Sequence, residues 1–332
     1  MLAAIRALPD HFALGWQSAA GIASPFASVV RRLIVCGMGG SAFPADLLAM
    51  HLRPRGVSVH TSRDYRVRSE HLGPHALVIA SSFSGNTEET LSAFEDARVR
   101  GASVIALTAG GQLAEGGGAA GVPLVRLVRP NPDFQPRAAT GFFVGALARL
   151  AEDAGLVHGL EADLADVAAS LRAQKDVEAR ADALANALVD RIPVVYAASP
   201  LADTARIIKI KFNENAKLPA FFNELPELNH NELVGFTRFA DRFAAVLLAD
   251  PQATPRMQRR LAMTAETLRE AGLTVHTMDL PAAPPLQQAF AALHLFDFVS
   301  YRLARLAGID PNPVALIEAF KKRLGPFPTP TD

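Results

Sequence analysis

The chain has 332 residues, half of them hydrophobic, with equal numbers of acidic and basic side chains. This length is too great for one simple domain and fits two of about 150 to 170 residues, each with its own core. A formal charge of zero without blocks of like charge argues against nucleic acid or an anionic membrane as the main partner. The single cysteine, Cys36, excludes an intrachain disulfide framework and is expected to be a small buried hydrophobe.

The start of the chain lacks the charged residues, long apolar run and small-residue cleavage site of a secretory signal. No apolar run approaches the roughly 20 residues that a membrane span requires. We therefore expect a cytoplasmic protein without a membrane partner.

In the first half of the chain, short runs of Val, Ile and Leu alternate with longer amphipathic stretches. This pattern is typical of a parallel sheet covered by helices on both faces. We predict strands near 32–36, 57–61, 76–80, 103–108 and 123–127. We predict helices near 41–52, 86–100, 111–116 and 138–154. Together they form one doubly wound domain.

From about residue 159 the chain becomes helical and alanine-rich, and then the alternation of strands and helices returns. We predict strands in IPVVYAAS, FAAVLLAD and TVHTMDL, and helices through Lys217 and near 255–271, 285–307 and 313–324. The predicted fold class is α/β, with two doubly wound, flavodoxin-like parallel-sheet subdomains and extra C-terminal helices. The second is expected to be a diverged copy of the first, with domains at residues 1–157 and 158–332. LAEGGGAAG and PFPTPTD are expected to be a flexible loop and a tail.

The strand LIVC runs directly into GMGGS, and a predicted helix follows. A glycine turn between a strand and a helix exposes backbone amides and the positive end of the helix dipole, which suits a phosphate. Gly37, Gly39 and Ala42 also satisfy the dinucleotide pattern G-x-G-x-x-G/A. The next strand, however, lacks the acidic residue that usually accompanies this pattern.

A second loop follows the strand ALVIA, where Ser82, Ser84 and Thr87 surround Gly85 at a predicted helix start. Hydroxyls and free amides at a helix start form a neutral anion cradle that needs no arginine. The alternative for this loop alone is an ordinary serine-rich turn. Two such loops after neighbouring parallel strands favour a phosphate site, because ligands gather at the carboxyl ends of strands in open sheets.

The segment 213–236, NENAKLPAFFNELPELNHNELVGF, places polar residues in a stretch too apolar for a solvated loop. Polar groups in such surroundings must be hydrogen-bonded, so we look for acid/base chemistry here. The apolar members of this segment are Phe221, Phe222, Leu225, Leu228 and Val234.

Glu214 is the first candidate for this chemistry. If residues 203–216 form a helix, Glu214 lies between Ile207 and Ile210 around the helix axis, on the apolar face. Burial there would increase its affinity for a proton, as a proton-shuttling base requires. The alternative is a structural glutamate that caps the helix or pairs with Lys211 or Lys217.

The motifs SSFSGNTEETL and CGMGGSAFPADLL resemble the sugar isomerase (SIS) domain, whose loops hold the phosphate of a hexose phosphate. NENAKLPAFFNELPELNHNELVGF, QPRAATGFF and DPNPVALIEAFKKRL resemble the bifunctional phosphoglucose/phosphomannose isomerase family within that fold. The resemblance covers nearly the whole chain. It implies an isomerase without a cofactor that interconverts glucose 6-phosphate, and also mannose 6-phosphate, with fructose 6-phosphate through a cis-enediolate. It implies that the phosphate is bound by Gly40, Ser41, Ser82, Ser84 and Thr87.

The resemblance also assigns the remaining roles. Glu214 is the base, and Arg137 stabilises the enediolate. His230 opens the sugar ring and is donated by the neighbouring subunit of a homodimer. Lys321 contacts the substrate near the ring oxygen, with the adjacent Lys322 as the alternative. From the residues themselves, the asparagines on either side of His230 are candidates to fix its tautomer.

Three positions depart from the family pattern. Ala42 stands where a glycine is commoner, and Asn312 and Val314 lie where relatives often carry a threonine. The preference between glucose and mannose phosphates therefore stays open. No metal is expected, because the nine histidines are scattered and Cys36 has no partner cysteine.

Two other functions compete with the isomerase. One is a non-catalytic SIS protein that senses or regulates through sugar phosphates, and the other is a transferase-associated aminosugar isomerase domain. A sensor need not keep Glu214, His230 and Arg137, and it would usually carry an appended module. The transferase reading would require a glutaminase nucleophile, which we do not find.

Overall fold

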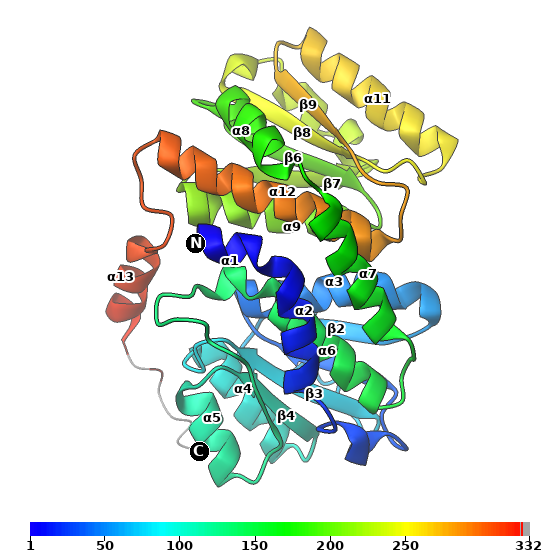
Figure 1. The fold of residues 1–332 in the computed structure, drawn as a ribbon, viewed down its shortest axis with the longest axis vertical. Helices are drawn as coiled ribbons and strands as arrows, with labels where there is room; N and C mark the ends of the chain where they lie inside the picture. Colours follow the sequence, from blue (N-terminus) through cyan, green and yellow to red (C-terminus); the bar gives the residue numbers. More distant parts are fainter. Residues whose placement is uncertain (326, 328–332) are drawn as a thin grey trace.

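The computed structural model describes residues 1–325 and 327 of the chain. Two parallel sheets lie at opposite ends of the molecule, with a layer of helices between them (Figure 1). Among the described residues, none of the helices combines the length and apolar character needed to span a membrane.

The first sheet has the strand order β2-β1-β3-β4-β5, and all its neighbouring strands pair in parallel. Its strands are β1 (Arg32–Cys36), β2 (Ser58–Ser62), β3 (Ala76–Ser82), β4 (Ser103–Thr108) and β5 (Leu124–Arg126). Its helices are α3 (Phe43–Leu52), α4 (Glu88–Val99), α5 (Gly111–Ala119) and α6 (Thr140–Asp153). The central strand β3 is buried along its whole length, which explains its continuous apolar run. The doubly wound fold predicted for this half is confirmed.

The second sheet has the order β7-β6-β8-β9, which repeats the order of the first four strands of the first sheet. Its strands are β6 (Ile192–Ala198), β7 (Phe221–Leu225), β8 (Phe243–Ala249) and β9 (Thr274–Asp279). Its helices are α9 (Ala202–Lys211), α11 (Pro255–Glu270), α12 (Pro285–Leu306) and α13 (Ala315–Leu324). The repeated strand order supports a diverged copy, while the boundary at 157/158 stays a prediction.

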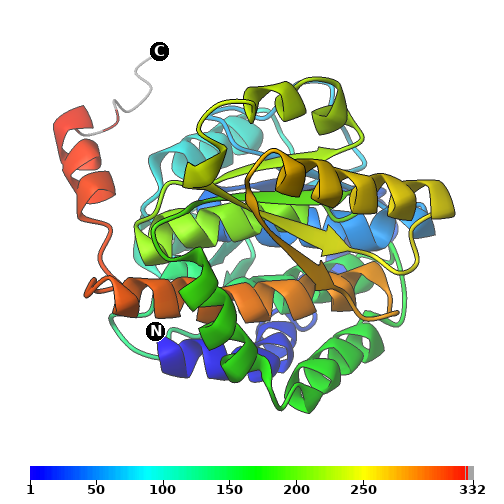
Figure 2. The same cartoon turned by 90° about the horizontal axis from the view of Figure 1, so that it is seen from above.

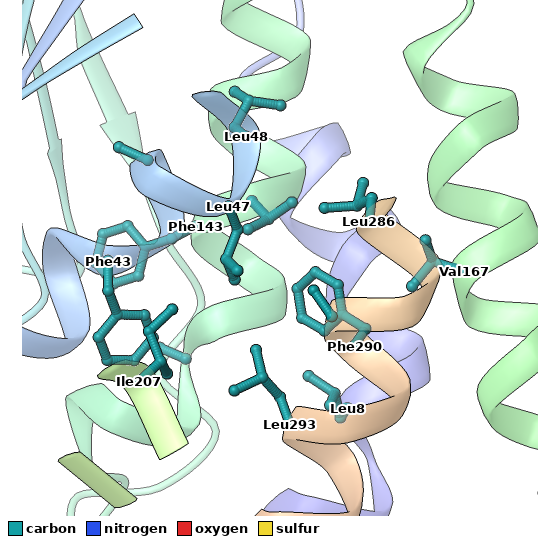
Figure 3. Close-up of a cluster of buried hydrophobic side chains, with 14 of the residues drawn as sticks. Leu8, Phe43, Leu47, Leu48, Phe143, Val167, Ile207, Leu286, Phe290 and Leu293 are labelled. Carbon is teal, nitrogen blue, oxygen red and sulfur yellow. The ribbon is translucent and has the colours of Figure 1, made fainter. Parts of the chain in front are cut away.

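The main core lies between the two sheets, where helices from both halves of the chain meet (Figure 3). It includes the terminal helix α2 (Leu8–Ser18), which follows the short α1 (Leu2–Arg6), and also α7 (Leu160–Ala173) and α8 (Val177–Leu188). Glycines let α2 and α6 approach closely, since a Cβ added to Gly145 would lie 2.2 Å from the carbonyl oxygen of Phe12. Phe290 of α12 is fully buried in this core, and its truncation to alanine would cost about 3 to 5 kcal/mol.

Short helical turns complete the chain. They are η1 (Ser24–Phe26), η2 (Gly39–Ser41), η3 (Arg53–Arg55), η4 (Pro136–Ala138), η5 (Phe212–Ala216), η6 (Glu227–His230), α10 (Glu232–Gly235) and η7 (Ala240–Arg242). Cys36 is fully buried, as predicted, and burial raises the pKa of its thiol to about 12.

The prediction that LAEGGGAAG is a flexible loop is wrong, because α5 continues through it to Ala119. Leu113 and Ala114 are buried against the sheet, and at Gly117 a Cβ would lie 3.4 Å from the side chain of Ala106. Burial of this face outweighs the poor helix propensity of three glycines. Apart from Phe327, the predicted tail PFPTPTD lies outside the described residues.

Candidate active site

The loop between β3 and α4 gathers the predicted hydroxyls. The Oγ atom of Ser82 lies 2.9 Å from Oγ1 of Thr87 and 3.4 Å from Oγ of Ser84. Gly85 makes the turn with φ 74°, and a Cβ there would lie 1.7 Å from the carbonyl oxygen of Gly110. The backbone N–H groups of Gly85 and Asn86 donate to Oγ of Ser82 and of Ser84 over 3.1 and 3.2 Å. The first turn of the following helix leaves further backbone amides without intrahelical partners beside these hydroxyls. This arrangement can hold a phosphate.

The loop after β1 is tied to this cradle. The backbone N–H of Phe83 donates to Oγ of Ser41 over 3.0 Å, and Oγ of Ser81 donates to the carbonyl of Ser41 over 2.7 Å. A Cβ added to Gly40 would lie 2.8 Å from the backbone nitrogen of Arg137. Glycine at this position therefore brings the loop against the turn η4, which carries Arg137. The structure thus brings both predicted loops and Arg137 together.

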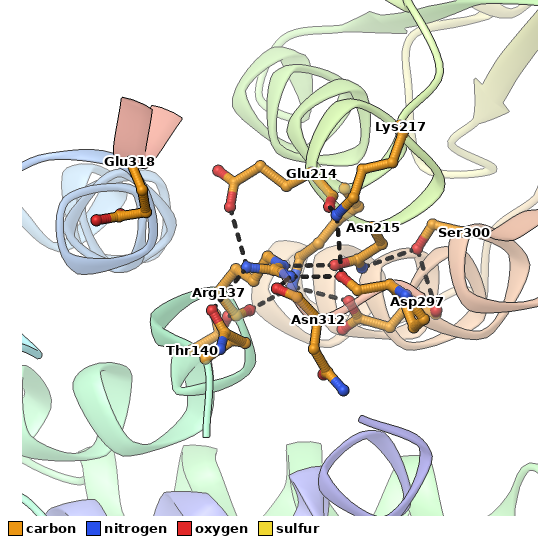
Figure 4. Close-up of polar contacts among 12 residues, drawn as sticks. Arg137, Thr140, Glu214, Asn215, Lys217, Asp297, Ser300, Asn312 and Glu318 are labelled. Carbon is orange, nitrogen blue, oxygen red and sulfur yellow. Dashed lines mark hydrogen bonds and ion pairs between the residues drawn. The ribbon is translucent and has the colours of Figure 1, made fainter. Parts of the chain in front are cut away.

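The guanidinium of Arg137 is buried and bound by segments far away in the chain (Figure 4). Its Nε donates to Oδ1 of Asn215 over 2.6 Å. Its Nη2 donates to the carbonyls of Pro311 and Asn312 over 2.7 and 2.9 Å. These bonds hold one side of the planar group in a fixed orientation.

The other terminal nitrogen, Nη1, makes the longer contacts. It donates to Oε1 of Gln135 over 3.1 Å and to Oε2 of Glu214 over 3.4 Å. Burial lowers the pKa of Arg137, and the negative charge of Glu214 opposes this effect. Since Nη1 has the weakest bonds, it is the nitrogen that can most easily turn to a substrate oxygen.

Glu214 lies in the π-helical turn η5, which continues α9. The prediction that it is buried on the apolar stripe is wrong, because its side chain keeps 26% exposure, whereas its neighbour Asn215 is only 2% exposed. A π-turn adds a residue to the turn and shifts the angular positions that follow it. Glu214 instead borders a cavity of about 660 Å³, together with Lys217 and the start of α13.

A buried polar group behind Arg137 was not predicted. Nζ of Lys211 pairs with Oδ1 of Asp297 over 2.8 Å and donates to the carbonyl of Arg137 over 2.6 Å. Nδ2 of Asn215 donates to Oγ of Ser300 over 3.0 Å. The suggested pairing of Lys211 with Glu214 is therefore wrong. The scarcity of lysine in an arginine-rich chain was the signal for this residue, since Lys211 is one of only six lysines.

His230 lies at the end of η6 and is exposed. The suggestion that its flanking asparagines fix its tautomer is not supported, since both bind other groups. Nδ2 of Asn229 donates to Oγ1 of Thr264, and Nδ2 of Asn231 donates to Oε1 of Glu227. No contact between His230 and Glu214 or Arg137 is recorded among the described residues.

The apolar surroundings predicted for the 213–236 segment are only partly present. Leu225 and Leu228 are buried, but Phe221, Phe222 and Val234 are 54%, 39% and 72% exposed. The two phenylalanines belong to β7, the edge strand of the second sheet, which was not predicted. The prediction of apolar surroundings is therefore wrong for Phe221, Phe222 and Val234, whose side chains are exposed in the single chain.

Lys321 lies on α13, which stands apart from the body of the molecule in both views (Figures 1 and 2). Its Nζ pairs with Oε1 of Glu318 one turn away over 3.0 Å, and both side chains are largely exposed. Lys322 is exposed as well, so the choice between the two lysines stays open. Within the described part of one chain, neither lysine contacts Glu214; Lys321 pairs with Glu318 instead.

Comparison with known proteins agrees with this arrangement. Residues 28–116 match the SIS domain, and residues 177–324 match the bacterial phospho-glucose isomerase C-terminal SIS domain. The chain is 32% identical to the bifunctional phosphoglucose/phosphomannose isomerase of Caldicellulosiruptor bescii, over 98% of each chain. It is also 32% identical to that of Aquifex aeolicus, over 93% of this chain and 94% of the other. The chain belongs to the bifunctional phosphoglucose/phosphomannose isomerase family. It is therefore an isomerase with SIS domains.

The fold of this family member is shared with more distant proteins. A hypothetical protein from Thermus thermophilus superposes with a TM-score of 0.76 at 16% identity, over 97% of this chain and 91% of the other. At this identity the match concerns the fold alone. It confirms the predicted architecture of two doubly wound SIS units.

Proposed function

We propose that this isomerase interconverts glucose 6-phosphate, and also mannose 6-phosphate, with fructose 6-phosphate. The observation that carries the proposal is the meeting of Glu214 with Nη1 of Arg137, 3.4 Å apart, at the edge of a cavity. The loop after β1, in which Gly40 lies against Arg137, is hydrogen-bonded through Ser41 to the loop after β3. Phosphate binding, a carboxylate base and a cation are thus adjacent, as an aldose–ketose isomerisation requires.

The phosphate binds at the cradle of Gly40, Ser41, Ser82, Ser84 and Thr87. The hydroxyls rotate to donate to the phosphate oxygens, and the positive end of α4 favours the negative charge. Because the cradle is neutral, it holds the phosphate without drawing the charge of Arg137 away from the reacting carbons. The remote phosphate then orients the sugar chain toward Glu214.

Glu214 moves the proton. In the open-chain aldose its carboxylate removes the proton from C2, and the electrons of the C–H bond form the C1–C2 double bond of a cis-enediolate while charge moves to O1. Nη1 of Arg137 stabilises that negative oxygen. The hydroxyl proton of O2 moves to O1, the C2–O2 bond becomes the carbonyl, and the electrons of the C1–C2 double bond take the proton back from Glu214 at C1. The ketose therefore forms with no net gain or loss of protons.

His230 acts from a second copy of the chain in our proposal, and Lys321 contacts the substrate near the ring oxygen. His230 is exposed and has no recorded contact with Glu214 in its own chain. Apolar side chains lie exposed near these residues, namely Phe221, Phe222, Val234, Leu316, Ile317, Phe320 and Leu324. Exposed apolar surface of this kind marks an interface between chains. A homodimer that covers it would bring His230 to the partner's cavity for ring opening.

A coupled assay that compares glucose 6-phosphate with mannose 6-phosphate tests the activity and gives the preference between them. In deuterated water, solvent deuterium should appear at C2 of the recovered aldose, because an enediolate exchanges its proton through the base. Turnover with complete retention of the C2 hydrogen would argue for a hydride shift. Absence of turnover on both sugars would overturn the proposal.

Mixed dimers test the donation of His230. The single variants Glu214→Gln and His230→Ala should each be nearly inactive. If His230 acts across the interface, a refolded equal mixture should regain about a quarter of wild-type activity, since half of its dimers carry one intact site. If His230 acts within its own chain, the mixture stays inactive.

A further inference from the structure

Lys217 occupies a backbone conformation that does not suit a lysine. It ends the π-turn with φ 55° and ψ 30°, in the left-handed region that glycine and asparagine adopt most easily. The N–H of Leu218 donates to the carbonyl of Phe212 over 3.2 Å and closes the turn, as at a helix end where glycine is the usual residue. A lysine that pays this conformational cost suggests that its side chain has a function.

The ammonium of Lys217 joins the parts of the active site (Figure 4). Its Nζ donates to the carbonyl of Glu214 over 2.5 Å and to the carbonyl of Pro311 over 3.1 Å. The carbonyl of Pro311 also accepts from Nη2 of Arg137 over 2.7 Å. One carbonyl oxygen therefore links the backbone that carries the base to the guanidinium that stabilises charge.

Electrostatics agrees with this location. Partial burial lowers the pKa of Lys217, and the positive charge of Arg137 lowers it further, while Glu214 and Asp310 oppose the shift. The ammonium also lies at the carboxyl end of a helical segment, where a cation is favourable. Two of its three N–H groups serve the two carbonyls, and the residue lines the cavity beside Glu214.

We propose that Lys217 is a positioning residue for the isomerisation. It fixes the backbone of Glu214 and the guanidinium of Arg137 to the carbonyl of Pro311, and so sets the distance between base and cation. The inference rests on the proposed function for its kinetic consequences. Its structural part, the tether of the π-turn, can be measured without substrate.

The left-handed backbone provides a test that separates the two roles. Lys217→Gly removes the ammonium and also relieves the backbone, so the melting temperature should stay the same or rise by about 1 to 2 °C. The kcat should fall by about 10- to 100-fold, since small displacements of catalytic groups have effects of this size. The KM should change by less than about threefold, because the phosphate cradle is untouched. If the kcat of Lys217→Gly stayed within about threefold of wild type, the inference would be overturned.

Asp190→Gly is the matched control. Asp190 has a similar φ of 60° but is exposed on a surface turn away from these residues. It should show the same effect on the melting temperature and no change in kcat. An equal loss of kcat in both variants would assign the effect to backbone flexibility and would overturn the role of the ammonium.

Two further variants keep the backbone strain and change only the head group. Lys217→Met should increase hydrogen exchange of the amides in 212–218, while Lys217→Arg should restore part of both protection and kcat. If the wild type failed to isomerise hexose phosphates, the exchange measurement would still show whether the ammonium of Lys217 holds the π-turn in place. Unchanged protection in Lys217→Met would overturn the tether.

Discussion

The two sheets of this protein share the order of four strands but face the candidate active site with opposite ends. The first sheet presents the carboxyl ends of β1 and β3, where glycine turns and hydroxyls precede helix starts. The second sheet presents the carboxyl end of α9, where the π-turn carries Glu214. In a parallel α/β unit the helices run against the strands, so this end corresponds to the amino edge of the sheet.

The carboxyl edge of the second sheet has different chemistry. A separate cavity of about 470 Å³ lies there, lined by apolar residues such as Leu201, Leu248 and Leu280. After β8 comes Asp250, whose Oδ1 accepts from the backbone N–H of Gln252 over 2.8 Å and from Nε2 of Gln288 over 2.7 Å. A carboxylate already satisfied by local donors disfavours a phosphate.

In our proposal, loop residues, and not the strand order, decide what each edge of a sheet binds. Hydroxyls and glycine turns suit the first edge to a dianion, whereas an acid and apolar side chains exclude one from the second. Substitutions at the two edges should therefore have very different effects.

The largest expected effect is on kcat, and it concerns Glu214, the residue that the second half of the chain contributes to the site. Glu214→Gln should lower kcat by about 10³- to 10⁴-fold, because it removes the proton-carrying group while keeping its size. Binding of glucose 6-phosphate, measured by calorimetry, should persist. Glu266→Gln on the exposed side of α11 is the control and should be active. Substantial remaining turnover in Glu214→Gln would exclude Glu214 as the base.

Next in size is the glycine that shapes the first edge. Gly85→Ala should lower the free energy of unfolding by about 3 kcal/mol or more, through left-handed strain and steric overlap. The overlap is severe, since the new Cβ would lie 1.7 Å from the carbonyl oxygen of Gly110. At Gly101 the φ is 72° but nothing lies within 4 Å, so Gly101→Ala should cost only about 1 to 2 kcal/mol. Urea unfolding compares the two, and equal costs would contradict the close approach.

A smaller effect is expected for a single hydroxyl of the cradle. Thr87→Ala should raise KM by about 10- to 100-fold, the value of one hydrogen bond to a charged group. Asp250→Ala, at the corresponding edge of the second sheet, should leave KM unchanged. Steady-state kinetics with both variants would show whether only the first edge binds phosphate. A raised KM in Asp250→Ala would break the comparison.

The smallest effect concerns the bond between the two units. Asn215→Ala removes the acceptor of Arg137 Nε, so the guanidinium loses one of its anchors. The kcat should fall by about tenfold while thermal stability decreases slightly. Asn186→Ala on the surface of α8, where the amide donates to the carbonyl of Asp182, is the control. Wild-type kcat in Asn215→Ala would show that Arg137 does not need this anchor.

Local patterns predicted most of the strands because each carries its own apolar run between turn residues. The run ALVIA, for example, predicts the buried strand β3, and the hydroxyls of SSFSGNT predict the cradle after it. The strand β7 was missed because it is an edge strand whose side chains, Phe221 and Phe222, lie largely exposed. Its sequence carries no burial pattern of its own.

The sequence by itself determined the α/β class, the two loops that form the cradle and the identity of Glu214 and Arg137 as candidates. These features depend on residues close together in the chain, where spacing and turn chemistry are local. Only the tertiary structure decided that α5 is helical through its glycines, that Asn215 lies inward beside Glu214, and that Pro311 links Arg137 to Lys217. Hydrogen bonds between segments more than 70 residues apart select the positions of Asn215 and Pro311. Packing of α5 against the sheet, with Gly117 close to Ala106, selects its helical form. No local pattern contains these contacts.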